Sequence, residues 1–298
     1  MTAFNGDPAV RAAVAAELAA ESPPAWADWR AGQADRIVWA DSVGLPPALV
    51  LLAVHLCQRF GDPSAGAVRL ALMIAAIEPG ARVEAVAHRF VVWAWRDADE
   101  PLSELAATAA WRASGEMVAE LHARAAEGQA IDRRDWRAAR AMLGRYDDDA
   151  AAQAAAVMAA SAWDLAATPG AAVDMVSAWE GLIAASLFAV RGWGTEEADA
   201  LQQQVTAQNA LARTRIGPEP AVADADAHDT WRRATADETL RLLNATGDPL
   251  LSRKAALNAE VAETRNRLRE AGLVALLSLL SGPSAAPGRL ISNIRGPQ

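Results

Sequence analysis

The sequence predicts an all-α protein, an alanine-rich multi-helix bundle or short helical array of about 10–11 helices with no sheet. Three observations predict this fold class. Hydrophobic residues make up 52% of the chain, and many of them are Ala, the strongest helix former. Signals for helix starts and stops recur along the chain. No run of alternating apolar and polar residues is flanked by the turn residues of a β-hairpin.

Several helix starts are marked by an Asp or Thr followed by Pro, at 7–8, 62–63, 168–169 and 248–249. The Asp or Thr side chain accepts a hydrogen bond from a free N–H of the first turn, and Pro at the first helical position presets φ. Gly falls in several gaps between helices, as expected for C-caps. We expect helices at about 8–21, 46–60, 63–77, 81–95, 101–127, 132–145, 147–167, 169–191, 195–213, 229–246 and 249–281.

The segment RFVVWAW (89–95) is the one stretch whose composition is typical of a strand. It continues an apolar pattern through Val83, Val86, Phe90 and Trp93. Because the 3,4,3 spacing of these residues is that of a helix face, we predict a helix here as well.

Segment 217–228 divides the expected domains. It contains two Pro and several small or acidic residues, which is typical of a linker. We expect a main helical domain at 1–216 and a C-terminal helical hairpin or docking segment at 229–281. Residues 282–298 are rich in Pro, Gly and Ser and are expected to form a flexible tail.

The last expected helix, 249–281, contains a partial heptad pattern. One row contains Leu250, Leu257, Thr264 and Ala271, and the other contains Val261, Leu268 and Ala275. Such rows either form a seam for a partner or pack against the body of the same chain.

The N-terminal half contains a series of motifs that resembles a known family. The motifs are FNGDPAVRA (4–12), ADRIV (34–38), VGLPPALVLLA (43–53), IEPGARVEAVAHRFVVWAWRDAD (77–99) and DWRAARAM (135–142). In these residues the chain resembles uncharacterised bacterial and phage-associated hypothetical proteins with an alanine-rich helical C-terminal part. Members of that family carry a stretch rich in Cys and His where this chain has only WADS (39–42). The family has no assigned activity, so the resemblance implies no function.

Charge and cysteine content exclude several protein classes. The net charge is −9, and no segment is basic enough to follow a phosphate backbone, so we expect no nucleic-acid partner. Cys57 is the only cysteine and cannot form an internal disulfide. No signal peptide is evident, and the apolar stretches 48–54 and 273–280 are far shorter than the roughly 20 residues of a spanning helix. We therefore expect a cytoplasmic protein with no membrane span.

No catalytic, cofactor-binding or metal-binding residue is predicted. The four His residues lie in four different segments, and none belongs to the Glu-x-x-His pair of a di-iron bundle. His55 and Cys57 lie about 200° apart on one helix, which is a poor geometry for two metal ligands. Asp147, Asp148 and Asp149 are better explained as acidic residues at a helix N-terminus. The motifs thus give no positive reason to expect an enzyme.

One cluster in DRRDWRAARAML is a candidate contact site. Arg133, Arg137 and Arg140 have 4,3 spacing and form one row on a helix, next to Trp136. The functional interpretation is a site for an anion or an acidic partner, with Trp136 as a neighbouring platform. The alternative is a solvated amphipathic face whose Arg residues pair with nearby Asp residues.

The sequence Ser-Ala-Trp followed by an acidic residue occurs twice, at 161–164 and 177–180. Thr-Pro-Gly at 168–170 lies between the two copies and predicts a helical hairpin rather than one helix. Trp163 and Trp179 would then differ in depth by about 7 Å and would not face each other. We expect both indoles in the core.

Two function classes remain. The first is a non-enzymatic helical protein-interaction module, such as a scaffold, inhibitor or immunity-type protein. Its partner would be another protein or a second copy, bound through 249–281. The second is a small-molecule-binding helical protein, or an enzyme, with a pocket between helices lined by Trp and Arg.

Overall fold

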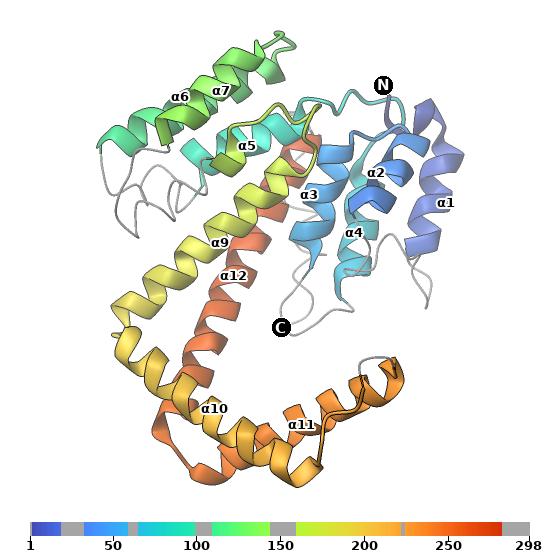
Figure 1. The fold of residues 1–298 in the computed structure, drawn as a ribbon. Helices are drawn as coiled ribbons and strands as arrows, with labels where there is room; N and C mark the ends of the chain where they lie inside the picture. The colour runs from blue at the N-terminus through green and yellow to red at the C-terminus, as the bar shows by residue number, and fades with distance from the viewer. Residues whose placement is uncertain are drawn as a thin grey trace. The chain divides into compact units, whose positions relative to one another are not determined.

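The structure is a computed structural model (Figure 1). It describes residues 2–18, 33–58, 65–98, 109–143, 159–221 and 224–281. Every regular element within these ranges is a helix, and no strand occurs in them. The predicted all-α fold class is therefore confirmed.

The described elements are a 3-10 turn and a series of α-helices. They are η1 (Ala3–Gly6), α1 (Pro8–Leu18), α2 (Gln33–Ser42), α3 (Pro47–Cys57), α4 (Ala65–Ala76), α5 (Val86–Arg96), α6 (Ala109–Ala126), α7 (Arg133–Leu143), α9 (Ala171–Val190), α10 (Thr195–Ile216), α11 (Ala225–Thr246) and α12 (Pro249–Ser281).

Helix α2 was not among the predicted helices. No pair of a capping residue and Pro precedes it, and its sequence is polar, with Arg36 and Ala40 as its buried residues. It packs against α3. The capping and periodicity signals in the sequence do not predict this helix, because it is stabilised by tertiary packing.

The predicted helix 147–167 is wrong over residues 162–167, which form bends and turns. The Asp164 carboxylate accepts a hydrogen bond from the Ala166 N–H at 3.0 Å, and the Thr168 N–H donates to the Asp164 carbonyl at 2.8 Å. Such a local Asp turn competes with helical hydrogen bonding. Residues 144–158, with the Asp run at 147–149, lie outside the described residues.

The N-terminal FNG sequence forms a strained turn. Phe4 and Asn5 have φ angles of 54° and 53°, and the Phe4 side chain is fully buried. The Gly80 N–H donates to the Ala3 carbonyl at 2.8 Å, and the Ala3 N–H donates to the Ala81 carbonyl at 3.1 Å. These bonds hold the segment after Gly80 outside the helix, so α5 begins five residues later than predicted.

The chain divides into two compact units. Unit 1 comprises Met1–Leu182 and Thr264–Gln298, and unit 2 comprises Ile183–Glu263. Both boundaries fall inside long helices, α9 and α12, rather than at a linker.

The expected linker 217–228 lies within unit 2 and joins α10 to α11, two helices that pack against each other. Helix α11 already begins at Ala225, where the Asp224 carboxylate accepts a hydrogen bond from the Ala227 N–H at 3.1 Å. This N-cap makes the connection shorter than predicted. The expected tail 282–298 lies outside the described residues.

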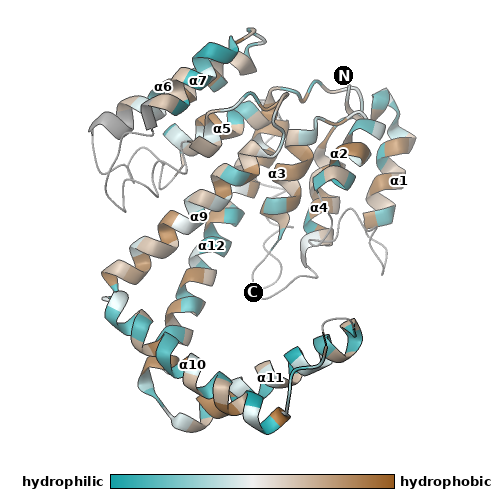
Figure 2. Ribbon diagram, in the orientation of Figure 1, coloured by the Kyte–Doolittle hydropathy of each residue, from teal (hydrophilic) through white to brown (hydrophobic). Residues whose placement is uncertain are grey.

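Helix α3 is the most deeply buried helix of unit 1. All residues from Ala48 to Val54 are buried, together with Leu56 and Cys57. Its sequence is accordingly apolar on nearly every face (Figure 2).

The C-terminal half of α12 completes this core although it comes late in the sequence. Leu273, Leu276 and Leu277 are buried. Gly272 allows a close approach, because a Cβ at this position would lie 2.9 Å from Leu56 Cδ2 and 3.4 Å from Phe90 Cζ. Unit 1 therefore contains α12 as part of its core.

Helix α9 is long and apolar enough, by length and composition alone, to cross a membrane, and it is the one such helix in the described residues. A core helix of a soluble protein passes the same test. Met175, Val176 and Trp179 of α9 are buried within unit 1. The absence of a membrane span remains a prediction from the sequence.

In unit 2, Arg253 caps the end of α9. Its Nη2 donates to the carbonyls of Arg191 and Gly192 at 2.8 and 2.9 Å. Nearby, the ammonium of Lys254 lies 3.8 Å from the ring centroid of Phe188. These contacts join the N-terminal part of α12 to the turn after α9.

A pair of buried imidazoles joins α5 to α6. His88 Nδ1 and His122 Nδ1 are 2.8 Å apart, and His122 Nε2 lies 2.7 Å from the carbonyl oxygen of Ser161. Because a carbonyl only accepts, His122 carries its proton on Nε2 and accepts a hydrogen bond from His88 Nδ1–H. The neutral pair thus holds residue 161 against both helices.

Burial also sets the protonation state of this pair. It lowers the pKa of His122 to about 3, and the neighbouring His88 adds to this effect. Burial likewise lowers the pKa of His88, although the charge of Asp164 opposes it. Both imidazoles are therefore neutral near pH 7.

The His pair predicts a loss of stability in mild acid. The unfolded chain binds protons at both His residues below about pH 6.5, whereas folded His122 resists protonation down to about pH 3. The stability that the neutral His pair contributes is complete above about pH 6.5 and declines as the pH falls toward about 3. Urea unfolding at about pH 7.5 and about pH 5.5 measures it. The H88Q/H122Q variant should show a smaller pH dependence than the wild type, and an equal dependence would contradict the assignment.

A second prediction concerns Gly115 of α6, which packs against Trp95. A Cβ at Gly115 would lie 2.4 Å from Trp95 Cζ3, so G115A should lower the free energy of unfolding by about 1–3 kcal/mol. Gly181 of α9 is the matched control, because a Cβ there meets nothing within 4 Å. G181A should be neutral or stabilise the protein by about 0.5–1 kcal/mol, since Ala is the better helix former. Equal effects in chemical denaturation would show that the Trp95 contact is unimportant.

Candidate functional site

The residues of the predicted contact site all lie on α7, but they do not form the expected arrangement. Arg133 and Arg137 are exposed, and Arg140 is half-buried. Trp136 is only 3% exposed and lies in a core cluster that includes Val118. The expectation that Trp136 offers a platform is therefore wrong, because the indole packs into the core on the face of α7 that adjoins the Arg row.

The aromatic partner of this row is a different Trp. The Arg140 guanidinium lies 3.7 Å from the ring centroid of Trp163, and Arg140 Nη1 donates to the Ala162 carbonyl at 2.5 Å. Trp163 is 38% exposed, so its predicted place in the core is wrong. The turn at Asp164 keeps Trp163 off a helix face. Trp179, at 1% exposed, is in the core as predicted.

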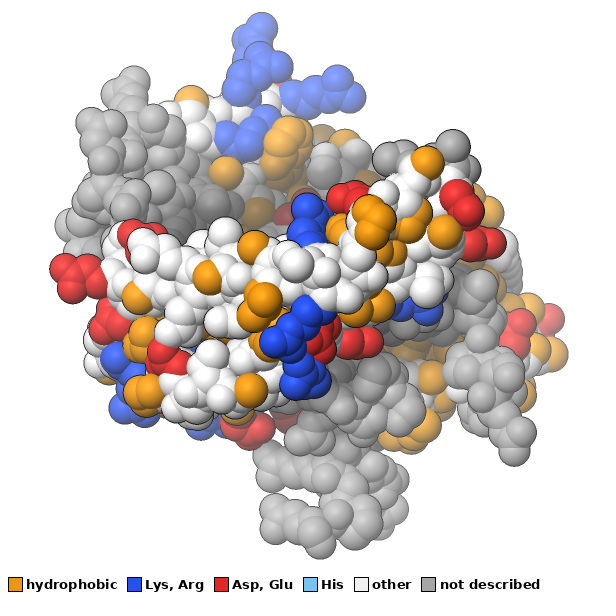
Figure 3. Space-filling model, turned by 60° about the horizontal axis from the view of Figure 1, so that its bottom comes forward, with side chains coloured by type: hydrophobic (Ala, Val, Ile, Leu, Met, Phe, Trp, Pro, Cys, Tyr) orange, Lys and Arg blue, Asp and Glu red, His pale blue; other side chains and the backbone are white. Residues whose placement is uncertain are grey.

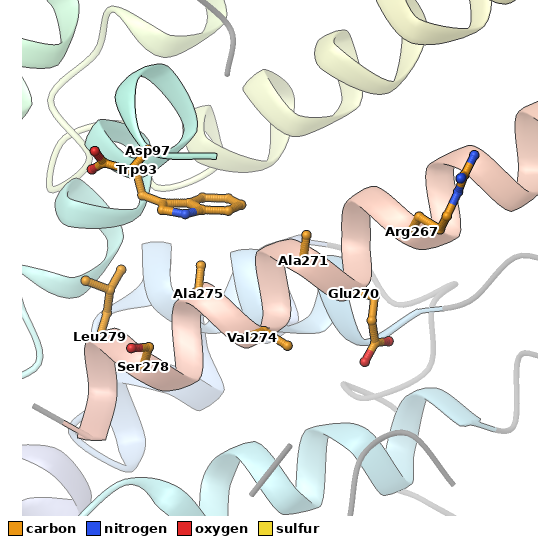
Figure 4. A pocket seen from close by; sticks show the side chains of 9 residues that line it. All are labelled: Trp93, Asp97, Arg267, Glu270, Ala271, Val274, Ala275, Ser278 and Leu279. Atoms are coloured by element: carbon orange, nitrogen blue, oxygen red, sulfur yellow. The ribbon is translucent and has the colours of Figure 1, made fainter. Parts of the chain in front are cut away.

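A pocket lies between α5 and α12 within unit 1 (Figure 4). Its volume is about 550 Å³, within the usual range for small-molecule sites. It is lined by Trp93, Asp97, Arg267, Glu270, Ala271, Val274, Ala275, Ser278 and Leu279.

Trp93 forms one wall of this pocket. Its indole lies across from α12, and Ala271 and Ala275 point from that helix toward the same space (Figure 4). The rings of Phe90 and Trp179 are neighbours of the indole, with their centroids 5.2 and 6.4 Å from the centroid of the Trp93 ring. These neighbours hold the ring in place, and the two small side chains leave room for a flat group in front of it.

Charged side chains stand at the two ends of the pocket. Asp97 lies beside Trp93, where α5 ends, and Arg267 and Glu270 lie further along α12 (Figure 4). The Glu270 carboxylate is ion-paired with Arg69 of α4, so its charge is already balanced. Asp97 has no ion-pair partner among the described side chains. The end of the pocket near Trp93 is therefore the more favourable end for a positive charge.

A buried ion pair between Arg269 and Glu180 joins α12 to α9 next to the pocket residue Glu270. Arg269 Nε and Nη2 donate to the two oxygens of Glu180 at 2.5 and 3.0 Å, and both side chains are buried. His55 Nε2 lies 3.4 Å from the same Glu180 oxygen that accepts from Nε. Burial alone raises the pKa of Glu180, but the interactions with His55 and Arg269 outweigh it and keep that pKa below its usual value.

Cys57 lies near these charges but is unreactive. It is 1% exposed, and burial raises the pKa of its thiol to about 12. The charge of Arg69 lowers this pKa and that of Glu270 raises it, both by less than burial does. Because the thiolate is the nucleophile, this thiol is unsuited to covalent catalysis near pH 7. The described residues contain no group of three or more His, Cys, Asp or Glu side chains placed to hold a metal ion.

An interhelical pocket lined by Trp and Arg was expected only as an alternative and without named residues, and the ion pair was not predicted. The sequence nevertheless carries a signal for the ion pair. Glu180 is an acidic residue in an otherwise apolar stretch of α9, so a buried position requires a cationic partner. Its partner comes from RNRLRE (265–270), a charged run directly before the apolar C-terminal part of α12. The sequence cannot show which Arg meets Glu180, because the two helices are far apart along the chain.

Comparisons with protein-family models, with curated proteins and with solved structures found no match. The chemistry of this site is therefore interpreted from its own residues.

The ion pair predicts a large cost for removing one partner. E180Q leaves the Arg269 charge buried without its counter-ion and should lower the free energy of unfolding by about 3–5 kcal/mol. E260Q is the matched control, because Glu260 pairs with Arg191 at an exposed site. This control should cost less than about 1 kcal/mol. The double variant E180M/R269M should unfold less easily than E180Q, and the opposite order would contradict the buried-charge explanation.

Proposed function

We propose that this protein binds a small, flat organic cation in the pocket between α5 and α12. The observation that carries the proposal is the Trp93 indole facing Ala271 and Ala275 across the pocket, with Asp97 in the lining at the same end. This proposal corresponds to the small-molecule-binding class that the sequence leaves open.

The shape of the pocket favours a planar ligand. The side chains opposite Trp93 are methyl groups, so a ring inserted there would contact the indole on one side and the surface of α12 on the other. The indole is supported by Phe90 and Trp179, so little ordering entropy is lost when a ligand binds.

The charges favour a cation over a neutral or anionic analogue. A positive group in front of the Trp93 ring is attracted by the π-electrons, and the carboxylate of Asp97 adds a direct electrostatic attraction. Arg267 stands toward the opposite end of the pocket, so it does not oppose a cation held at Trp93.

The protein-interaction role through 249–281 has less support from this helix. Leu257 and Val261, two residues of its predicted seam, are each only 6% exposed, and Leu273 and Leu276 are buried as well. Leu257 and Val261 are thus used for packing within the chain, whereas Leu250 and Leu268 of the same rows are half-buried. Removing α12 would test the folding of this protein rather than its association.

Binding can be measured as a shift of the melting temperature with 2-naphthylmethylammonium. At a concentration about tenfold above its Kd, this cation should stabilise the protein by about 1.4 kcal/mol and raise Tm by roughly 3–5 °C. The neutral 2-methylnaphthalene and the anionic 2-naphthoate should give smaller shifts. Equal shifts with all three compounds would contradict the role of charge.

Two variants test the location of this binding. A271L fills the space in front of Trp93 and should abolish the shift, whereas A255L, at an exposed position of the same helix, should retain it. D97N should reduce the preference for the cation over its neutral analogue. A ligand shift that survives A271L would place the binding elsewhere.

A further inference from the structure

The exposed face of α7 carries a row of basic side chains. Arg133, Arg134 and Arg137 are exposed, and none of their guanidinium groups meets an ion-pair or hydrogen-bond partner among the described residues. Figure 3 shows a group of basic side chains near the top of the view, in a protein whose net charge is −9. The predicted alternative, in which nearby Asp residues neutralise this row, has no ion pair to support it in the described part of the chain.

The position of these charges is unfavourable for the helix itself. Arg133, Arg134 and Arg137 all lie in the first five residues of α7, next to the positive end of the helix dipole. The acidic residues that counter the dipole are Asp132, whose carboxylate accepts from the Arg134 N–H at 2.7 Å, and Asp135. These Arg residues therefore destabilise the start of the helix and gain no contact within the described chain in return. Residues that break a local stability rule in this way are typical of binding sites.

The buried face of α7 that adjoins the row fixes the orientation of the helix. Trp136 and Ala139 are buried against α6, so the helix cannot turn its Arg residues inward. At the far end of the row, Arg140 is stacked on the partly exposed ring of Trp163. The surface therefore combines a fixed row of positive charge with an apolar ring at one end.

From this arrangement we propose that α7 docks an acidic amphipathic helix of another protein. Arg133, Arg137 and Arg140 follow an i, i+4, i+7 pattern on one face, so carboxylates with the same spacing on a partner helix would lie opposite them. Guanidinium groups form two-pronged hydrogen bonds with carboxylates. An apolar residue of the partner helix would then contact Trp163. A nucleic acid fits less well, because the acidic chain around this short row repels an extended phosphate backbone.

The test is fluorescence anisotropy with a labelled helical peptide that carries Glu at i, i+4 and i+7 and one Leu. The full-length chain should bind this peptide, and binding should weaken as salt rises. The variant R133Q/R134Q/R137Q should weaken binding about tenfold or more. Its circular dichroism should match the wild type, because the substituted side chains are exposed.

A charge-matched variant separates a local site from the effect of net charge. It carries R82Q, R232Q and R233Q, three substitutions at exposed Arg residues that do not belong to α7. Its affinity should stay within about twofold of the wild type, because long-range charge effects are screened by salt. Equal weakening by both variants would overturn the proposal. So would a single-stranded DNA of equal charge that binds as tightly as the peptide and depends on the same three Arg residues.

Discussion

The buried ion pair between Glu180 and Arg269 is the interaction on which unit 1 depends most. It joins α9 to α12 across 89 positions of sequence and places a carboxylate and a guanidinium where water cannot solvate them. Neither charge is tolerable there alone, so the two helices must meet in one register. That register sets which residues of α12 face the core and which face α5. The tight contact of Gly272 with Leu56 and Phe90 is compatible with the same register.

The pocket follows from this placement of α12. Directly after Glu270 the helix changes from charged to small residues, and Ala271 and Ala275 face the space in front of Trp93. Larger side chains at these positions would fill the gap between α5 and α12. The pocket is thus a consequence of small residues next to a fixed charge pair, and the proposed preference for a flat cation rests on the indole and the carboxylate at the end of α5.

The α7 region is organised by a separate set of polar contacts. The imidazole pair ties residue 161 to α5 and α6, and Arg140 ties the neighbouring turn to α7. Trp136 fills the core beneath, and the basic row faces outward. The sequence predicted both faces of this amphipathic helix, because their spacing is a local property. It assigned the wrong Trp to the basic face, because the turn at Asp164 depends on a local carboxylate contact that helix periodicity does not reveal.

The sequence by itself determined the helical class and the starts of α1 and α12, whereas α9 begins at Ala171, two residues after the Pro that was expected to open it. Helix α12 begins at Pro249 after a left-handed Gly247, as its cap residues predict, because caps and φ restrictions act within a few residues. Only the tertiary structure decided which indoles are buried, which one lines the pocket and which Arg meets Glu180. Burial depends on the surface that each helix meets, and that surface comes from segments distant along the chain. Helix α2 shows the same limit, since it folds against α3 without a strong signal of its own.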